Sequence, residues 1–253
     1  MNRKTAFLIC STVLLSTNIS ILTRIYADEK QTVNTNKIVD GKEESFTDET
    51  IESNTVDTSV ICNQNGGTVT INKNTLHKSG DTNNEDGKNA VVFTTGSSFT
   101  KIDQSDLQST SKGSSGIVAN EKAMVYANDS TIMTSNDSAN GLEAVSNGQI
   151  IANQMDITTQ GNQSAAVYAK QSDGSISLTN STLSTDGNNA PLLYANGTIE
   201  VDNVSGTASH SKIAEVEGGQ HLSIYNSQFS STNNSLFNEV MKNGIRIQGV
   251  QDS

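Results

Sequence analysis

The fold of this chain is decided by a short repeated pattern that is clearest in Ser175-Ile176-Ser177-Leu178-Thr179-Asn180-Ser181-Thr182-Leu183. The apolar residues Ile176 and Leu178 are separated by two, which puts both side chains on one face of a β-strand. Leu183 follows five residues later, and the polar Asn180 lies between them where a turn is expected. The same pattern recurs every 23 to 26 residues from Val69 to Ile247, with one longer step near the start.

Three kinds of position recur in register. The apolar residue that ends each repeat is Leu76, Leu107, Ile132, Ile157, Leu183 and Phe229, with Gly206 at the midpoint of the last, doubled step. The apolar pairs are Val69 and Ile71, Thr100 and Ile102, Val125 and Ala127, Ile150 and Ala152, Ile176 and Leu178, Ile199 and Val201, and Leu222 and Ile224, in which Thr100 alone is polar. The polar turn position is Lys73, Gln104, Asp129, Gln154, Asn180, Asn203 and Asn226.

This period predicts a stack of coils, because one repeat of about 24 residues cannot bury its apolar face alone. The repeat is too short for a propeller blade, and no 3.6-residue period indicates paired helices. A third short apolar run precedes each pair, as in 90–93, 116–119, 141–144, 166–168, 192–194 and 214–216. We therefore expect an all-β protein, a right-handed parallel β-helix with three short strands per coil and about seven coils.

The chain divides into four predicted segments. Residues 1–27 are expected to be a signal peptide, because Arg3 and Lys4 precede an apolar stretch and Ile25-Tyr26-Ala27 suits cleavage. Residues 28–65 are interpreted as an acidic polar spacer whose end could cap the first coil, and residues 66–241 as the parallel β-helix. Residues 242–253 are interpreted as an incomplete last coil or tail, which leaves open whether the chain is a shortened form of a longer protein. Such an open end favours either fraying or end-to-end self-association.

The charge balance argues against polyanionic partners. The chain has 16 basic and 27 acidic residues, and removal of the three basic residues in 1–27 leaves a formal charge of −14. Such a field repels phosphate backbones and anionic lipid, so we expect no nucleic-acid partner and no membrane insertion after signal cleavage. Cleavage also leaves Cys62 without a second cysteine, so no internal disulfide is expected.

Candidate sites are few. Asp81, Asn83 and Glu85 place oxygen ligands at alternate positions, as a calcium loop does, but the glycine comes one place late and the twelfth position lacks a bidentate Glu. A plain insertion loop explains the same residues, since the longest repeat falls there. Glu200 and Asp202 could form an exposed acid and base pair, or simply solvate the coil. We expect no enzyme activity, no catalytic residue and no cofactor, and no binding residue can be assigned.

The strings 180–187 and 190–199 resemble repeats of secreted, adhesin-like β-helix proteins of Gram-positive bacteria. The resemblance covers 66 to about 241 and implies a surface or extracellular protein with interaction roles. We therefore expect a secreted or cell-surface protein whose stacked coils present an extended polar face to a glycan or protein partner. It provides no catalytic residue to carry over, and repeats of this kind indicate fold better than function. The alternatives are a β-helix polysaccharide lyase or glycoside hydrolase, and a truncated relative without function.

Overall fold

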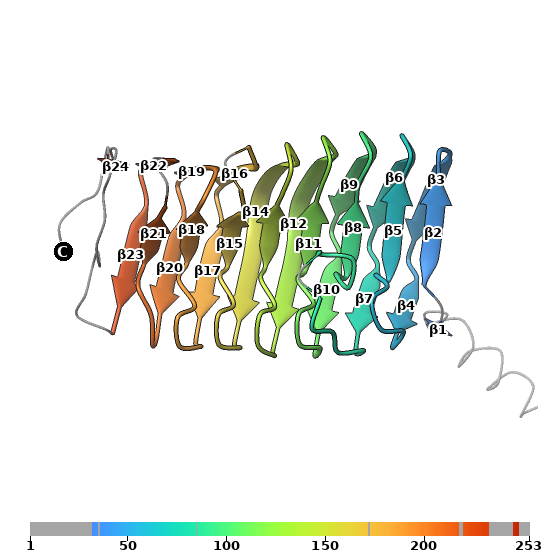
Figure 1. The fold of residues 1–253 in the computed structure, drawn as a ribbon, viewed down its shortest axis with the longest axis horizontal. Helices are drawn as coiled ribbons and strands as arrows, with labels where there is room; N and C mark the ends of the chain where they lie inside the picture. Colours follow the sequence, from blue (N-terminus) through green and yellow to red (C-terminus); the bar gives the residue numbers. More distant parts are fainter. Residues whose placement is uncertain are drawn as a thin grey trace, which may run out of the picture. The chain divides into compact units, whose positions relative to one another are not determined.

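The computed structural model describes residues 36–84, 86–171, 173–217 and 220–232 in full, and the backbone alone of Thr32–Asn34 and Ile245–Ile247. These residues form a stack of parallel β-strands, in which successive coils lie side by side along one axis (Figure 1). The predicted signal peptide, 1–27, lies outside the described residues. In the residues described, no helix has the length and apolarity needed to cross a membrane.

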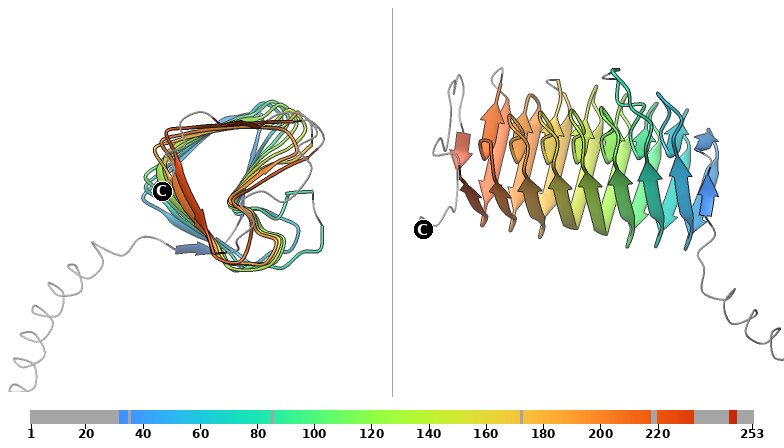
Figure 2. Two further views of the ribbon diagram at one scale, coloured as in Figure 1. Left: turned by 90° about the vertical axis from the view of Figure 1, so that its left-hand side faces the viewer. Right: turned by 90° about the horizontal axis from the view of Figure 1, so that it is seen from below.

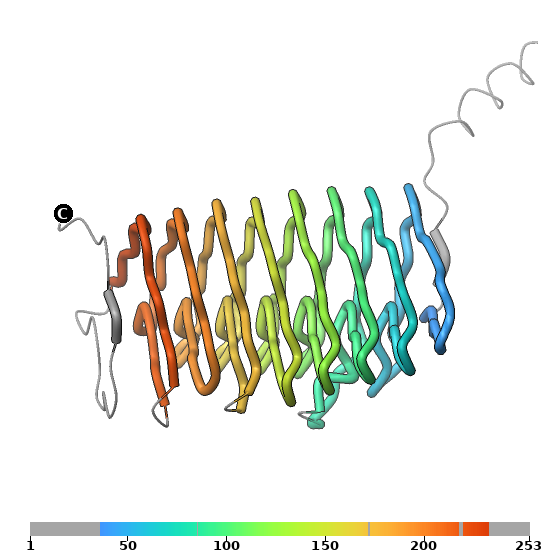
Figure 3. Tube along the Cα trace, turned by 90° about the horizontal axis from the view of Figure 1, so that it is seen from above, coloured from blue at the N-terminus to red at the C-terminus, as the bar shows by residue number. Residues whose placement is uncertain are grey.

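Each coil contributes one strand to an eight-stranded parallel sheet. Its members, in spatial order, are β2 (Lys37–Asp40), β5 (Ile61–Gln64), β8 (Val92–Thr94), β11 (Ile117–Ala119), β13 (Leu142–Ala144), β15 (Val167–Ala169), β18 (Leu193–Ala195) and β21 (Ala214–Val216). Eight strands in this order correspond to eight coils, which stand at even spacing in Figure 3.

The remaining sixteen strands form the other two faces of the coil. The first face contains β3 (Glu43–Thr47), β6 (Thr68–Asn72), β9 (Phe99–Asp103), β12 (Met124–Thr134), β14 (Gln149–Thr159), β16 (Ser175–Thr179), β19 (Thr198–Asp202), β22 (His221–Tyr225) and β24 (Ile245–Ile247). The second face contains β1 (Thr32–Asn34), β4 (Thr50–Ser53), β7 (Thr75–Lys78), β10 (Asp106–Ser109), the ends of β12 and β14, β17 (Thr182–Thr185), β20 (Ser205–Ala208) and β23 (Gln228–Ser231).

The predicted register is confirmed strand by strand. Leu183 pairs with Ile157 on one side and Gly206 on the other, and Leu178 pairs with Ala152 and Val201. The paired inner residues are buried, so the core is a column of stacked small and medium apolar side chains. The polar rung Thr100 is also buried, and its hydroxyl bonds Thr94 Oγ1 at 2.8 Å and Asn63 Nδ2 at 3.0 Å. The column therefore accepts a polar layer in which the Thr100 hydroxyl is hydrogen-bonded to two neighbouring side chains.

The predicted turn positions are also confirmed. Each has a left-handed backbone, with φ between 46° and 56° at Lys73, Gln104, Asp129, Gln154, Asn180, Asn203 and Asn226. Asn side chains tolerate this region better than most residues and can bond one another along the stack. Asn203 Nδ2 donates to Asn180 Oδ1 at 2.8 Å, so these two side chains continue the ladder outside the strands.

The structure corrects the predicted start of the stack. Residues 37–53, assigned to the acidic spacer, form a complete first coil through β2, β3 and β4, which raises the number of coils from about seven to eight. Phe46 and Ile51 occupy inner rungs there and are buried. The sequence pattern hid this coil because its other inner position is the acidic Glu44, which pairs with Val69.

At the other end, the backbone of β24 pairs with β22, so that Ile245 lies opposite Leu222 and Ile247 opposite Ile224. The expected register of a further coil is therefore present in those three residues. The rest of the predicted tail, 242–253, lies outside the described residues.

Candidate functional site

One outward-facing ladder runs along the eight-stranded sheet, with a single rung from each coil. In order, its members are Ile38, Cys62, Phe93, Val118, Glu143, Tyr168, Tyr194 and Glu215. Neighbouring rungs lie about 4.8 Å apart, the usual spacing of paired strands. The first four residues are apolar or a thiol, whereas the last four are carboxylates and tyrosines. The chemistry of this face thus changes halfway along the stack.

The insertion loop 79–91 covers part of the apolar half. It accounts for the longer repeat, and Figure 2 shows it leaving the otherwise superimposed outline of the coils beside a concave bend. Phe93, Val118 and Ala90 form a small buried cluster outside the main column. Gly87 approaches so closely that a Cβ there would lie 2.9 Å from Val118 Cγ1. The loop therefore acts as a cover over Phe93 and Val118.

A buried lysine holds the start of this loop. Lys78 is fully buried, and its Nζ donates to Thr55 O at 2.9 Å and Gly80 O at 3.1 Å. Burial lowers the pKa of the Lys78 ammonium, and the nearby carboxylates of Asp81 and Asp57 oppose that effect. The ammonium thus joins two backbone carbonyls, one of which, Gly80 O, also accepts from Asn89 Nδ2 at 2.7 Å.

Beyond the loop, the polar half of the ladder lies in an open groove with a volume of about 660 Å³. One wall is formed by turn residues that include Gly113, Ser138, Gln163 and Asn189. The floor and the opposite side contain Ser115, Asn140, Glu143, Tyr168, Lys170, Tyr194, Lys212 and Glu215. Thr82, Asn83, Asn84 and Gly87 of the insertion loop line one end. The groove follows the stack axis because every lining position repeats from coil to coil.

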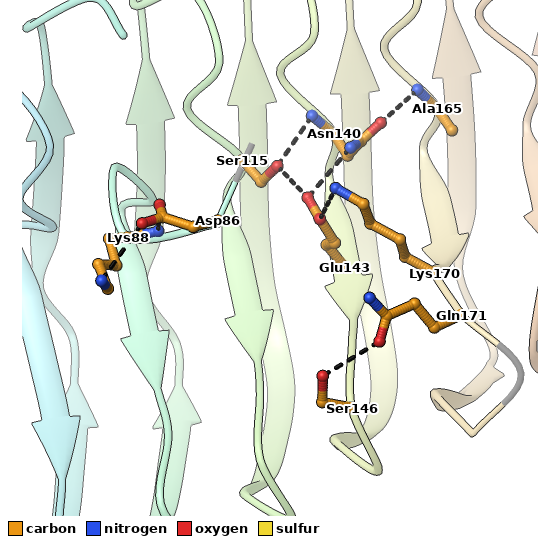
Figure 4. Close-up of polar contacts among 9 residues, drawn as sticks. All are labelled: Asp86, Lys88, Ser115, Asn140, Glu143, Ser146, Ala165, Lys170 and Gln171. Atoms are coloured by element: carbon orange, nitrogen blue, oxygen red, sulfur yellow. Dashed lines mark hydrogen bonds and ion pairs between the residues drawn. The ribbon is translucent and has the colours of Figure 1, made fainter. Parts of the chain in front are cut away.

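Glu143 is the most buried carboxylate of the groove. Its Oε2 accepts hydrogen bonds from Ser115 Oγ at 2.8 Å and Asn140 Nδ2 at 3.1 Å, and its Oε1 lies 3.7 Å from Lys170 Nζ (Figure 4). Asn140 Oδ1 in turn accepts from Ala165 N at 2.8 Å. Through these contacts Glu143 ties three successive coils together at the floor.

The two tyrosines form a stacked pair. Their ring centroids are 4.6 Å apart and the planes differ by 4°, so the rings follow the ladder spacing. Burial, together with a hydrogen bond from the hydroxyl to Glu217, raises the pKa of Tyr194 above its usual range. Because the facing sides of the rings cover each other, the pair offers mainly ring edges and polar tips to the groove.

The wall presents polar side chains at rung spacing. Left-handed backbones, with φ of 54°, 56° and 52°, occur at Ser138, Gln163 and Asn189. Backbone hydrogen bonds join these turns from one coil to the next, such as the one from Ser138 N to Asn162 O at 2.9 Å. Among the described residues, none of these three side chains has a hydrogen-bond partner. The wall therefore carries unengaged amide and hydroxyl groups that repeat once per coil.

Of the candidate metal ligands, Asn83 lines one end of the groove. Asp81 Oδ1 accepts from Lys112 N at 2.8 Å, in the same way that Asp137 Oδ1 accepts from Asn162 N and Asn162 Oδ1 from Asn188 N. Asn83 Oδ1 accepts from Lys112 Nζ at 3.1 Å, and Glu85 lies outside the described residues. Within the described ranges, no three His, Cys, Asp or Glu side chains gather in a way that could hold a metal ion. Asp81 is thus the first rung of an external side-chain ladder.

Glu200 and Asp202 lie on β19, on a different face from the groove. Asp202 Oδ1 accepts from Asn226 Nδ2 at 2.8 Å, which continues the external ladder of the turn. The structure therefore does not bring this pair together with the groove carboxylates.

Sequence reasoning did not identify the groove, although a signal for it was present. The third short strand of each coil was recognised, and its middle residue reads Glu143, Tyr168, Tyr194 and Glu215 in successive coils. Following that outward position down the stack would have found the ladder. The wall could not be found in this way, because its residues lie in turns without a fixed strand register.

Comparisons of the chain with protein-family models, with curated proteins and with solved structures found no match.

Proposed function

We propose that this chain is a secreted or surface-exposed, adhesin-like binding protein that holds a glycan in its groove without cleaving it. The observation that carries the proposal is the row of unengaged side chains at Ser138, Gln163 and Asn189, which faces a groove lined by Tyr168 and Tyr194. Amides and hydroxyls both donate and accept hydrogen bonds, as sugar hydroxyls do. A concave site with a few such convergent groups is the usual form of a small-ligand site.

The same geometry argues against a glycosidase that would use Glu143 and Glu215 as its pair of carboxylates. Glu143 and Glu215 are three rungs apart, a separation of about 14 Å, whereas paired catalytic carboxylates of glycosidases lie within about 10 Å of each other. Glu143 Oε2 already accepts two hydrogen bonds, so this oxygen has no lone pair left to take a proton from a substrate.

An array of glycans probed with purified residues 28–253 tests the binding proposal. The matched pair of variants is Tyr168→Ala in the groove and Tyr126→Ala, which removes a tyrosine that is 41% exposed on the first face. We expect glycan binding that Tyr168→Ala reduces and Tyr126→Ala leaves intact. Equal loss in both variants, or a signal only with protein ligands, would contradict the proposal.

The second part of the proposal is that the groove does not cleave its ligand. An assay for reducing sugars and unsaturated products tests it on pectin, alginate and any glycan that binds on the array. We expect no turnover. Turnover that disappears in Glu143→Gln would establish the enzyme alternative.

A further inference from the structure

We propose that the ligand of the groove is an uncharged, linear glycan that lies along the stack axis and meets one coil with each sugar unit. This inference rests on the proposed glycan-binding function and specifies the class and orientation of the ligand. Three observations carry it: the pairing of the charges, the spacing of the rungs and the length of the open groove.

Four of the six charged side chains that line the groove form ion pairs. Glu143 Oε1 lies 3.7 Å from Lys170 Nζ, and Lys212 Nζ lies 3.5 Å from Glu215 Oε2. The remaining two have neutral partners: Lys112 Nζ donates to Asn83 Oδ1, and Asp137 Oδ1 accepts from the backbone and side-chain nitrogens of Asn162. The lining thus has three acidic and three basic groups and no net charge, in a chain of formal charge −11.

A charged ligand at either ion pair would compete with the charged partner already there. Leaving the other member of a partly buried pair unpaired costs more than the exchange returns, as breaking the pair by mutation would. The hydroxyls of a neutral sugar, in contrast, can bond the unengaged side chains of the wall without disturbing any pair. The balanced and largely paired charges therefore favour an uncharged glycan over uronic acids and free amino sugars.

The spacing of the rungs sets the orientation. Wall and floor repeat every 4.8 Å or so along the axis, which is close to the length of one hexose unit in an extended polymer. An extended peptide repeats a side chain on one face only about every 6.6 Å, so it drifts out of step with the coils. A linear glycan can instead place successive units against Ser138, Gln163 and Asn189 in equivalent geometry.

The insertion loop limits the length of the open groove. It lines the groove at the coil of Ser115 and covers Val118, so the open rungs are Glu143, Tyr168, Tyr194 and Glu215. Four open coils accommodate about four sugar units. Affinity should therefore rise with chain length up to about the tetrasaccharide and then level off.

Titration calorimetry on the full chain tests the inference with neutral oligosaccharides of two to six units, and with oligogalacturonides and chitosan oligomers of the same lengths. We expect binding of a neutral series, a plateau near four units and little change between low and high salt. Gln163→Ala should weaken binding roughly three- to tenfold, as loss of one hydrogen bond does. Gln160→Ala, an exposed glutamine of the same coil outside the groove lining, should have no effect.

The outcomes separate the two proposals. Salt-sensitive binding of a charged series alone would overturn the uncharged ligand and leave glycan binding standing. An affinity that is independent of length would overturn the axial orientation. Failure of every oligosaccharide, neutral or charged, would overturn the proposed function itself.

Discussion

The two halves of the outward ladder on the eight-stranded sheet differ in what covers them. Phe93 and Val118 lie buried beneath the insertion loop, whereas Glu143, Tyr168, Tyr194 and Glu215 line an open groove. The inner column beneath both halves is the same stack of apolar residues. The difference teaches that the coils supply a uniform scaffold, and that outward side chains and a single loop decide which part of it is available to a ligand.

Removal of the covered aromatic ring should have the largest effect. Phe93→Ala empties the cluster under the loop, and we expect a loss of about 3–5 kcal/mol in the free energy of unfolding. Tyr168→Ala in the open half should cost much less, because that ring is partly exposed. Denaturant unfolding of both variants measures the contrast, and equal losses would mean that the loop does not cover Phe93 in solution.

Truncation in the inner column should destabilise the scaffold beneath the groove. Leu178 is fully buried between Ala152 and Val201, so Leu178→Ala should cost ~2–5 kcal/mol. Ser177→Ala, on the outward side of the same strand, is the control and should have little effect. An unchanged thermal midpoint in Leu178→Ala would show the register to be wrong.

The contact between the loop and Val118 can be isolated with two glycines that have the same backbone φ angle. Gly87 and Gly66 both have φ of 77°, but a Cβ at Gly87 would meet Val118 Cγ1 at 2.9 Å and a Cβ at Gly66 meets nothing within 4 Å. Each change to Ala should cost roughly 1–3 kcal/mol for the left-handed backbone. If the loop is closed over Val118, Gly87→Ala should lower the free energy of unfolding by more than Gly66→Ala does. Equal losses in the two variants would indicate an open loop.

The smallest effect should be a dependence of stability on pH that comes from Lys78. Its pKa is lowered in the folded state from the ordinary value of 10.5, so between these two values the unfolded chain binds more protons than the folded one. Stability should therefore rise as pH increases through the lowered pKa toward 10.5. The difference in unfolding free energy between the native chain and Lys78→Met should show this rise. A difference that falls with pH over the same window would contradict the burial of the ammonium.

The stack itself could be predicted from the sequence, because its physical cause is local and repeated. An apolar pair at a spacing of two, followed by a polar residue that tolerates a left-handed turn, specifies each coil on its own, as Ile176, Leu178 and Asn180 do. The first coil was missed because Glu44 interrupts that pattern at the end of the column, where an inner position is only half-buried.

The groove was decided by the tertiary structure. Glu143, Ser115 and Lys170 belong to three different coils, and nothing in their sequence spacing indicates that their side chains meet. The loop that closes one half of the ladder reads as a polar insertion, and its role depends on where Gly87 meets Val118. Repetition along the chain fixes which residues face inward, because burial repeats with the coil. What faces outward becomes a site only when loops and neighbouring coils bring unlike residues together.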